Sequence, residues 1–428
     1  MPPRGSCGGI WRAWGMSDLS WPDVSLGNIF TINTSAVIPN AAPNTEFYHH
    51  SLPAWDATGG PTVEKGSSIE SNKVNITKPC VLVSKLNPRK PRVSVLESVG
   101  KDERHCASTE FVCLEPKAKE HLRFWGHLFS NKRFAGHLDR MAIGSTNSHK
   151  RFSPGVLLSL RIELPSEPER RLIARILDTL DTQIQKTEAL IAKLEKVKEG
   201  LLHDLLTRGI DDNGQLRPSP EQAPELYKES PLGLIPREWN AVRLYEMAEN
   251  HDGQRIPLKK SERKHGTYPY YGASGIIDWV EGYLFEGSYV LLGEDGENVV
   301  SRNLPLAFPV TGRFWVNNHA HIYSPKDDCD TRFLVEVLEQ KDYSRWVNGS
   351  AQPKITQASL RMMWFCKPPT AEQKAISNSL EAINQQIDEE KIKIAKVRTQ
   401  KAGVMDDLLT GRVRVTPLLD KAQATTPA

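Results

Sequence analysis

The stretch ERRLIARILDTLDTQIQKTEALIAKLEKVKEGLLHDLLT at residues 169–207 returns as EQKAISNSLEAINQQIDEEKIKIAKVRTQKAGVMDDLLT at residues 372–410. The two copies align without a gap, and 14 of their 39 positions are identical. Each copy follows a longer block that contains short strand-like segments. The chain therefore alternates block, helix, block, helix, and this internal duplication predicts a molecule with two-fold pseudo-symmetry.

Apolar residues recur in both copies with alternating steps of three and four, the period of a coiled-coil seam. A pseudo-two-fold axis across the pair favours antiparallel packing, and about 40 residues of helix would span roughly 60 Å. The fold class expected is α+β, with two α/β domains separated by two long helices that form an antiparallel coiled coil. The seam residues expected to interdigitate are Leu177, Leu180, Ile184, Ile191, Leu194, Leu380, Ile383, Ile387, Ile394 and Val397.

Bulk properties fit a globular protein of several domains. The chain has 428 residues, 39% of them hydrophobic and 25% charged, and a formal net charge of +3 that leaves room for local basic patches. No apolar run reaches the length of a membrane span, and the N-terminus lacks the apolar core of a signal peptide. None of the cysteines forms a C-x-x-C pair, so we expect no disulfide framework, no zinc ribbon and a cytoplasmic location.

Breaks in composition suggest where the parts begin and end. Ser166 with Glu169 has the spacing of a capping box, and Gly209 supplies a helix stop. The parts expected are a disordered tail or mis-assigned start at 1–16, a first block at 17–164, a long helix at 165–209, a proline-rich irregular linker at 210–236, a second block at 237–367, a long helix at 368–411 and a polar tail at 412–428.

The two blocks share a faint common order. Trp21-x-x-Val24-x-Leu26 in the first matches Trp239-x-x-Val242-x-Leu244 in the second. Each block then has strands, a helix, a Gly-Ser turn and a segment that we expect to be extended, at 156–162 and 360–365. Shared order with diverged content is what two recognition modules for two different targets would show.

Basic and aromatic clusters in both blocks predict contacts with a polyanion. Lysine and arginine neutralise phosphates, and Asn, Gln, Arg and Lys on loops can read base edges in the major groove. A solvated surface is the alternative interpretation for any single cluster. The DNA-binding candidates are Lys85, Arg89, Lys90, Arg92, Asn147, Lys150 and Arg151 in the first block, and Arg255, Lys259, Lys260, Tyr268, Tyr270, Tyr271, Gly349, Ser350, Gln352 and Lys354 in the second.

Signatures of catalysis are missing from the sequence. It contains no Walker A motif, no G-x-G-x-x-G, no zinc-ligand spacing and no N-P-P-Y-like motif for amino methylation. The pairs His49-His50 and His319-x-His321 are expected to be structural rather than metal ligands. The acidic run Glu294-Asp295-Gly296-Glu297 leaves open a solvated turn or a nuclease site, of which the turn is favoured. We therefore expect no catalytic residue and no metal in this chain.

Three features together resemble the specificity subunit of type I restriction–modification systems. They are Tyr268-Pro269-Tyr270-Tyr271-Gly272-Ala273-Ser274-Gly275, the segment from Gly349-Ser350-Ala351-Gln352-Pro353-Lys354-Ile355 to Pro368-Pro369-x-x-Glu372-Gln373, and the two long helices that end in Asp-Leu-Leu-Thr. The resemblance spans about residues 20–415. The first block departs from it, because its turn reads Gly144-Ser145-Thr146-Asn147 and a single Pro165 replaces the Pro-Pro.

The resemblance implies two target recognition domains that read a split, asymmetric sequence of double-stranded DNA. It also implies helices that set the spacer and dock two methyltransferase subunits, with restriction and translocase subunits as further partners. S-adenosylmethionine, ATP and Mg²⁺ would belong to those partners, and this chain would bind no cofactor. From the residues alone, a coiled-coil structural adaptor that reads no DNA remains the alternative.

The turn after Gly349 has two interpretations. Gln352 could offer a bidentate amide to adenine, and Lys354 could contact a phosphate. Alternatively the turn ends the preceding segment and Gln352 bonds the local backbone.

Overall fold

The computed structural model describes residues 21–144, 146, 148–348 and 353–424. The chain divides into two compact units. Unit 1 is residues 1–188 with 392–428, and unit 2 is residues 189–391. Each unit thus combines one of the two blocks with one part of each long helix.

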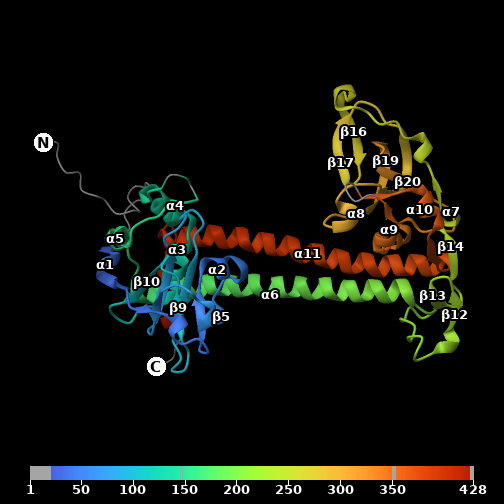
Figure 1. Cartoon of the computed structure of the whole chain (residues 1–428). Helices are drawn as coiled ribbons and strands as arrows, with labels where there is room; N and C mark the ends of the chain where they lie inside the picture. The colour runs from blue at the N-terminus through green and yellow to red at the C-terminus, as the bar shows by residue number, and fades with distance from the viewer. Residues whose placement is uncertain (1–20, 145, 147, 349–352, 425–428) are drawn as a thin grey trace. The chain divides into compact units, whose positions relative to one another are not determined.

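The long helices are α6 (Glu167–Thr207) and α11 (Thr370–Leu409). In unit 1 the first part of α6 lies beside the last part of α11, where Lys401 pairs with Asp181 and Arg398 Nη2 lies 2.5 Å from Glu188 Oε1. In unit 2 the order is reversed, with Lys391 Nζ 3.0 Å from Glu195 Oε1 (Figure 1). The antiparallel pairing expected from the seam is confirmed.

The seam residues face inward to different degrees. Leu177, Leu380, Ile383, Ile387, Ile394 and Val397 are buried, whereas Leu180, Ile184, Ile191 and Leu194 are half-buried. The start of α6 and the end of α11 join the main core of unit 1, since Leu177 and Leu408 belong to the same cluster. Leu205 and Leu380 likewise share the main core of unit 2.

The domain of unit 1 is built from one short strand pair and two antiparallel or mixed sheets. β1 (Asp23–Ser25) pairs with β11 (Arg161–Glu163). The four-stranded sheet has the order β2 (Phe30–Asn33), β10 (Phe111–Pro116), β7 (Cys80–Ser84) and β8 (Val93–Leu96). The five-stranded sheet has the order β3 (Ala36–Val37), β6 (Lys73–Ile76), β9 (His105–Ala107), β4 (Glu46–His50) and β5 (Thr62–Lys65), with β4 and β9 parallel. The helices are α1 (Leu26–Ile29), α2 (Leu52–Thr58), α3 (Leu122–Ser130), α4 (Lys132–Met141), α5 (Pro154–Ser159) and, after α11, α12 (Thr416–Ala424).

Unit 2 has one larger sheet. The six strands have the order β15 (Ala248–Asn250), β20 (Ala320–Pro325), β18 (Phe285–Gly293), β19 (Ala307–Val316), β16 (His265–Gly272) and β17 (Gly275–Val280). Two-stranded pairs are β12 (Tyr227–Ser230) with β13 (Gly233–Pro236), β14 (Asn240–Arg243) with β23 (Trp364–Lys367), and β21 (Val347–Asn348) with β22 (Lys354–Ile355). The helices are α7 (Leu244–Met247), α8 (Asn298–Ser301), α9 (Thr331–Gln340) and α10 (Gln357–Met362).

A common frame encloses both domains. Each begins with a strand followed by a one-turn helix, β1–α1 or β14–α7, at the matching Trp-x-x-Val-x-Leu positions. Each closes with a short helix and a strand that pairs antiparallel with the first, α5–β11 or α10–β23. The closing segments at 156–162 and 360–365 were expected to be extended, but each is helical over its first part. Ser153 and Thr356 cap these helices by accepting hydrogen bonds from the backbone N–H groups of Val156 and Ser359.

Two other stretches carry more structure than their composition indicates. The proline-rich linker contains the β12–β13 hairpin, in which Tyr227 and Ile235 are buried. The segment expected to be a polar tail contains α12, and Val415 before it is buried in the core of unit 1. In the part of the chain that the structure describes, no helix is both long and apolar enough to cross a membrane.

Candidate nucleic-acid interface

In unit 1 the structure brings together two loops that are far apart in the sequence. The β7–β8 loop carries Lys85, Arg89 and Lys90, and its Asn87 N–H donates to the carbonyl oxygen of Lys150 at 2.8 Å. Leu86 also forms an isolated bridge with Arg151. The two basic clusters predicted in the first block therefore form one surface, which we call the unit 1 basic loops (residues 85–92 and 148–151).

The cations of these loops outnumber the carboxylates with which they pair. Five cations share three carboxylates, so the pairs carry a surplus of two positive charges. Lys90 and Arg92 share Asp56, Arg89 and Lys150 share Asp139, and Arg151 pairs with Glu110. Lys90, Arg89 and Arg151 keep about half of their side chains exposed, at 57%, 51% and 48%. Such a surface suits the phosphate backbone of a nucleic acid.

Arg92 differs from its neighbours because it is buried. Its Nε and Nη2 donate to the two carboxylate oxygens of Asp56 at 2.8 and 2.9 Å. Hydrogen bonds from Arg92 and then Lys90 hold the pKa of Asp56 well below its usual range. Arg92 thus supports the loop, while the exposed cations around it remain the candidates for phosphate contact.

In unit 2 two of the predicted cations meet on one buried carboxylate. Arg255 Nη1 lies 2.7 Å from Glu294 Oε2, and Lys354 Nζ lies 2.8 Å from Glu294 Oε1. Burial opposes ionisation of Glu294, but hydrogen bonds from Lys354 and Arg255 outweigh it and hold the pKa of the carboxyl below its ordinary value. Glu294 therefore fixes β22 to the end of β18.

The remaining polar groups of this region extend the same network. His319 Nδ1 lies 2.9 Å from both carboxylate oxygens of Asp295. His321 Nδ1 lies 2.6 Å from Asp252 Oδ2, and its Nε2 donates to the carbonyl oxygen of Ile355 at 3.0 Å. The acidic run after β18 is thus neither a simple solvated turn nor a cluster of free carboxylates. Its first two carboxylates anchor neighbouring loops.

Several loops converge on this network at one end of the unit 2 sheet. The β16–β17 turn lies against Gly293, where a Cβ atom would approach the carbonyl oxygen of Ala273 to 2.6 Å. The β19–β20 turn joins through the N–H of Asn317, which donates to the carbonyl oxygen of Tyr271 at 3.0 Å. Lys354 remains 45% exposed beside them. We call this set the unit 2 loop cluster (residues 273–274, 294–296, 317–319 and 353–355).

The three predicted tyrosines have different surroundings. Tyr270 is fully buried, and its hydroxyl accepts a hydrogen bond from the N–H of Leu258 at 3.0 Å. Tyr271 packs against Phe308 and Phe314 in the core. Tyr268 is half-buried, with its ring 5.1 Å from that of Tyr283. Tyr270 and Tyr271 therefore hold the β16 strand in place, whereas Tyr268 and Tyr271 are both only half-buried.

The other predicted residues lie at exposed positions or outside the described part of the chain. Lys259 and Lys260 are exposed on the loop that precedes β16. Asn147, Gly349, Ser350 and Gln352 lie outside the described residues.

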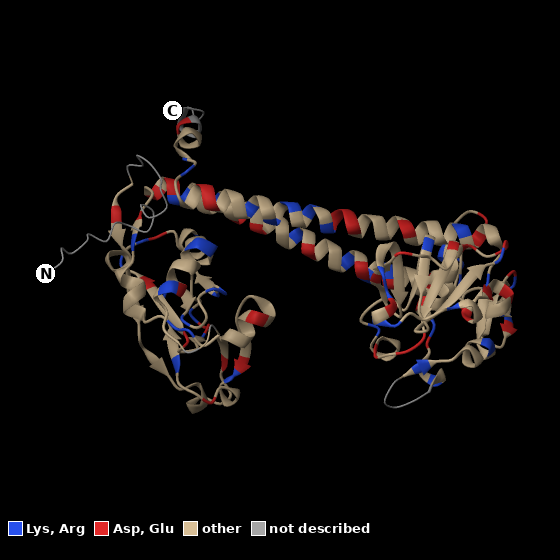
Figure 2. Cartoon of the chain, turned by 90° about the horizontal axis from the view of Figure 1, so that it is seen from above, with Lys and Arg blue, Asp and Glu red and all other residues tan. Residues whose placement is uncertain are grey.

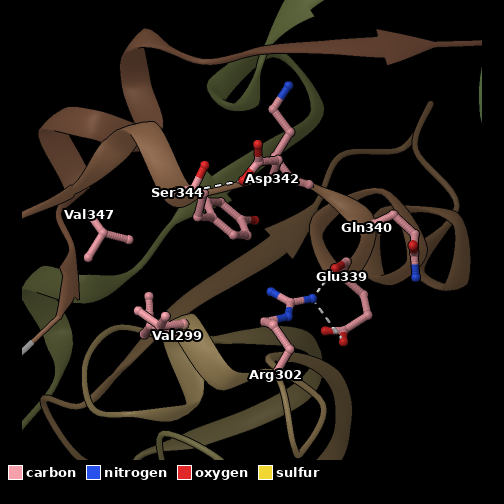
Figure 3. A pocket seen from close by; sticks show the side chains of 10 residues that line it. Val299, Arg302, Glu339, Gln340, Asp342, Ser344 and Val347 are labelled. Atoms are coloured by element: carbon pink, nitrogen blue, oxygen red, sulfur yellow. Dashed lines mark hydrogen bonds and ion pairs between the residues drawn. The ribbon is translucent and has the colours of Figure 1, made fainter.

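One pocket and one group of charged side chains have features of a small-ligand or a metal site. A pocket of about 580 Å³ in unit 2 is lined by α8, α9 and the segment after α9, as Figure 3 shows. Its Arg302 is paired with Glu339 at 3.0 Å, and Glu339 in turn accepts from the N–H groups of Leu306 and Ala307 at 2.8 Å. Because these charged groups bond one another, the pocket presents no cluster of free polar groups to a ligand.

Among the described residues, the one group of three side chains that could hold a metal ion is His127, Asp178 and Asp181 in unit 1. Arg123 Nη2 lies 2.7 Å from Asp178 Oδ1, and Lys401 pairs with Asp181. These cations already neutralise the two carboxylates, so the group acts as an ion-pair network between α3 and the long helices of unit 1.

Comparisons with known proteins agree with this geometry. The profile of the type I restriction modification DNA specificity domain matches residues 19–196 and 236–399. The chain is 37% identical over 146 residues to a Haemophilus influenzae protein provisionally named as a type I restriction enzyme specificity subunit, covering 34% of this chain and 37% of that protein. It is 25% identical over 291 residues to the type I restriction enzyme MjaVIII specificity subunit of Methanocaldococcus jannaschii, covering 60% and 63%. The alignments thus span less than two thirds of each relative.

A solved structure shares the fold. It comes from work on complex assembly and conformational transition of the type I R-M system, and it superposes with a TM-score of 0.58 at 18% identity. The superposition covers 92% of this chain and 98% of the other.

Proposed function

The chain belongs to the family of the type I restriction modification DNA specificity domain, and from this premise we propose that it is the DNA-reading specificity subunit of a type I restriction–modification complex. The observation that carries the proposal is that two separate stretches match the family, the first mostly in unit 1 and the second mostly in unit 2. We assign the reading of one half-site to residues 17–164 and of the other to residues 237–367. Since the two domains share a frame but differ in their sheets and loops, the combined DNA site is split and asymmetric.

In this proposal the phosphate contacts come from exposed cations on both domains. The unit 1 basic loops supply Lys85, Arg89, Lys90, Lys150 and Arg151. On unit 2 the contacts come from Lys259, Lys260 and Lys354. These loops are held by Arg92, Arg255, Tyr270 and Tyr271. Base reading is assigned to Asn147, Tyr268, Gly349, Ser350 and Gln352.

We further propose that the long helices dock two methyltransferase subunits, and that restriction and translocase subunits join the complex. Charges of both signs follow the helices in each unit, as Figure 2 shows, and apolar side chains are exposed between them. Val197 is 49% exposed and Ile392 is 71% exposed. S-adenosylmethionine, ATP and Mg²⁺ are assigned to the partner subunits, the chain itself carries out no chemical step, and the complex acts in the cytoplasm.

Selection from a pool of random DNA duplexes tests the proposal. The full chain, purified with its methyltransferase partners, is expected to enrich one bipartite sequence. Its affinity should fall steeply with salt, because each neutralised phosphate adds about 0.9 to the slope of log K against log salt. A matched variant with Lys85, Arg89 and Lys90 replaced by alanine should bind more weakly with a shallower slope. If the chain binds no DNA but still binds the methyltransferase subunits, it is instead a coiled-coil adaptor.

A further inference from the structure

A buried carboxylate at the start of α11 joins three separate parts of unit 2. Glu372 Oε2 accepts a hydrogen bond from Trp239 Nε1 at 2.9 Å. Arg217 donates to both oxygens of Glu372, with Nη2 3.1 Å from Oε2. The N–H of Ile210 donates to Oε1 at 2.9 Å. We call Trp239, Glu372 and Arg217 the unit 2 clamp.

Unit 1 contains the same arrangement at the start of α6. Glu169 Oε2 accepts from Trp21 Nε1 at 3.3 Å and from the hydroxyl of Ser166 at 2.9 Å. Arg414 donates to Glu169 Oε1 from Nη2 at 2.7 Å and from Nε at 3.0 Å, and its guanidinium lies 4.9 Å from the centre of the Trp21 ring. Trp21, Glu169 and Arg414 form the unit 1 clamp.

The two clamps have the same connectivity. The tryptophan stands at the entry to the domain, and the glutamate stands in the first turn of the long helix that leaves the domain. The arginine follows the end of the other long helix, which runs antiparallel. Each clamp therefore ties a domain, its own helix and the end of the neighbouring helix to one carboxylate.

The arginines do not come from the sequence repeat. Arg217 follows the end of α6 at Thr207 by ten residues, whereas Arg414 follows the end of α11 at Leu409 by five. The structure thus reaches the same contact by two chain paths of different length. This indicates that the contact between arginine and glutamate is needed where each domain joins the long helices of its unit.

Gly209 shows how tightly the chain is held against the unit 2 clamp. It has a φ of +66°, and a Cβ atom there would lie 2.2 Å from Glu372 Oε1, 2.4 Å from Trp239 Cζ2 and 2.6 Å from Arg217 Nη1. No side chain fits without moving all three members of the clamp. Gly411, two residues after the end of α11, also has a positive φ, of +69°.

The hydrogen bonds of the two clamps resist rotation of each domain relative to the helices of its own unit. The carboxylates of Glu169 and Glu372 are almost wholly inaccessible, at 3% and 8% exposed, and each accepts directional charge-assisted bonds from several sides. If the domain rotated about its helix, the buried carboxylate would lose its hydrogen-bond partners. An unpaired buried charge is strongly destabilising. The clamp therefore fixes the angle between each domain and the helices of its own unit.

We propose that Glu169 and Glu372 are positioning residues, which hold each DNA-reading domain at a set angle on its helices and thereby restrict the spacer between half-sites that the subunit accepts. The inference rests on the proposed function. It adds a determinant of spacer selectivity that lies away from the basic loops and touches no DNA.

Spacer-resolved binding tests the proposal. The probes are duplexes with the selected half-sites, separated by the preferred spacer or by one base pair more or less. Wild type is expected to discriminate sharply, whereas Glu372→Gln and Glu169→Gln should each reduce the preference for the best spacer at least fivefold and leave the base preferences within each half-site unchanged. Glu188→Gln on α6 removes an exposed ion pair with Arg398 on α11, and as the matched control it should keep the wild-type profile.

A milder variant keeps the proposal testable if the glutamate variants fail to fold. Trp239→Phe removes one donor of the unit 2 clamp and keeps the aromatic ring, and it should broaden the spacer profile in the same direction. Wild-type spacer profiles in all three clamp variants, with lowered melting temperatures alone, would overturn the inference and leave the clamps as scaffold. If the wild-type protein selects no bipartite site, the proposed function is wrong. That result differs from the one that would overturn the inference, in which the wild type and the variants all keep a strong preference for one spacer length.

Discussion

The two units differ most in their sheets and least in the joints that connect the sheets to the helices. Unit 1 divides its strands between a four-stranded and a five-stranded sheet, whereas unit 2 has one sheet of six. Yet both domains open and close with paired strands, and both are held by a tryptophan, a glutamate and an arginine. The joint has stayed the same while the reading surface has changed, as expected of two modules that present different loops to different half-sites.

The largest expected effect comes from exchanging a reading surface while keeping its joint. Replacing residues 237–367 with the corresponding block of another family member should change one half of the selected DNA sequence completely and leave the other half as it was. The reciprocal exchange of residues 17–164 is the control, and it should change the other half alone. Selection and sequencing of bound duplexes measures both. A change in both halves after a single exchange would show that the domains do not read independently.

A substitution at matched seam positions should instead affect the two units alike. Leu177 and Leu380 occupy equivalent places in the repeat, and they are 0% and 1% exposed in the cores of unit 1 and unit 2. Leu177→Ala and Leu380→Ala should each destabilise the unit concerned by about 2–5 kcal/mol, because a cavity replaces buried methyl groups. Hydrogen exchange resolved along the chain locates the loss.

The exposed seam flank supplies the control for these variants. Leu190 is 38% exposed on α6, so Leu190→Ala should leave hydrogen exchange in both units close to that of wild type. Loss of protection spreading equally through both units from either core variant would contradict the division into two units.

Acid should weaken the joint of unit 1 through Glu169. Burial opposes ionisation of this carboxyl, but hydrogen bonds from Arg414 and Ser166 outweigh it and lower its pKa from the ordinary 4.5. As the pH falls below that value, the unfolded chain takes up a proton while the folded carboxylate stays ionised, so the stability contributed by Glu169 is complete above about pH 5 and is lost toward the folded pKa. Melting temperatures between about pH 3 and pH 6 should therefore fall less steeply in Glu169→Gln than in wild type. Parallel curves would show that other carboxylates govern the acid response.

Periodicity made the helices predictable, since a seam with a period near 3.5 residues can serve only one kind of packing. The repeat of Trp21 at Trp239 and of Glu169 at Glu372 was also visible in the sequence. Their connection was not, because Arg217 and Arg414 stand at different distances beyond their helices and no sequence alignment pairs them. Contacts between segments that are distant in the sequence depend on the path of the chain in the tertiary fold. The local sequence pattern does not predict that path.

The closing segments of the two domains show a different limit. Residues 156–162 and 360–365 are apolar enough to be extended, and each ends as a strand. Their first parts are helical because Ser153 and Thr356 cap them and because Leu157 and Leu360 are buried in the respective cores. Tertiary burial decided between helix and strand in both domains, so the same error in prediction occurs at the same place in the common frame.

Among the candidate site residues, most of the predicted cations are at least partly exposed, whereas Arg92 and Tyr270 are buried. The separated clusters at 85–92 and 148–151 came together on one surface as basic loops. Tyr270 is fully buried, and Tyr271 is half-buried against the rings of Phe308 and Phe314. A Tyr-rich strand has the same composition whether it serves a core or a surface, and only the sheet order distinguishes the two.

The smallest expected effect compares one cation in each unit. Lys354 Nζ bonds the buried Glu294, whereas Arg151 bonds the more exposed Glu110. If both residues contact phosphate, Lys354→Ala and Arg151→Ala should each weaken binding to all sequences and lower the slope of log K against log salt by about 0.9. The fall in affinity between 50 and 200 mM salt would then be roughly threefold smaller than in wild type. Lys354→Ala should also lower the melting temperature, because Glu294 then keeps Arg255 as its partner but loses a second cation, while Arg151→Ala should leave melting nearly unchanged. Titrations of duplex binding at several salt concentrations, with thermal melts of the same samples, separate the two contributions. A lowered melting temperature with an unchanged salt slope in Lys354→Ala would show that the lysine supports β22 rather than contacting phosphate. The phosphate contacts of unit 2 would then be assigned to Lys259 and Lys260.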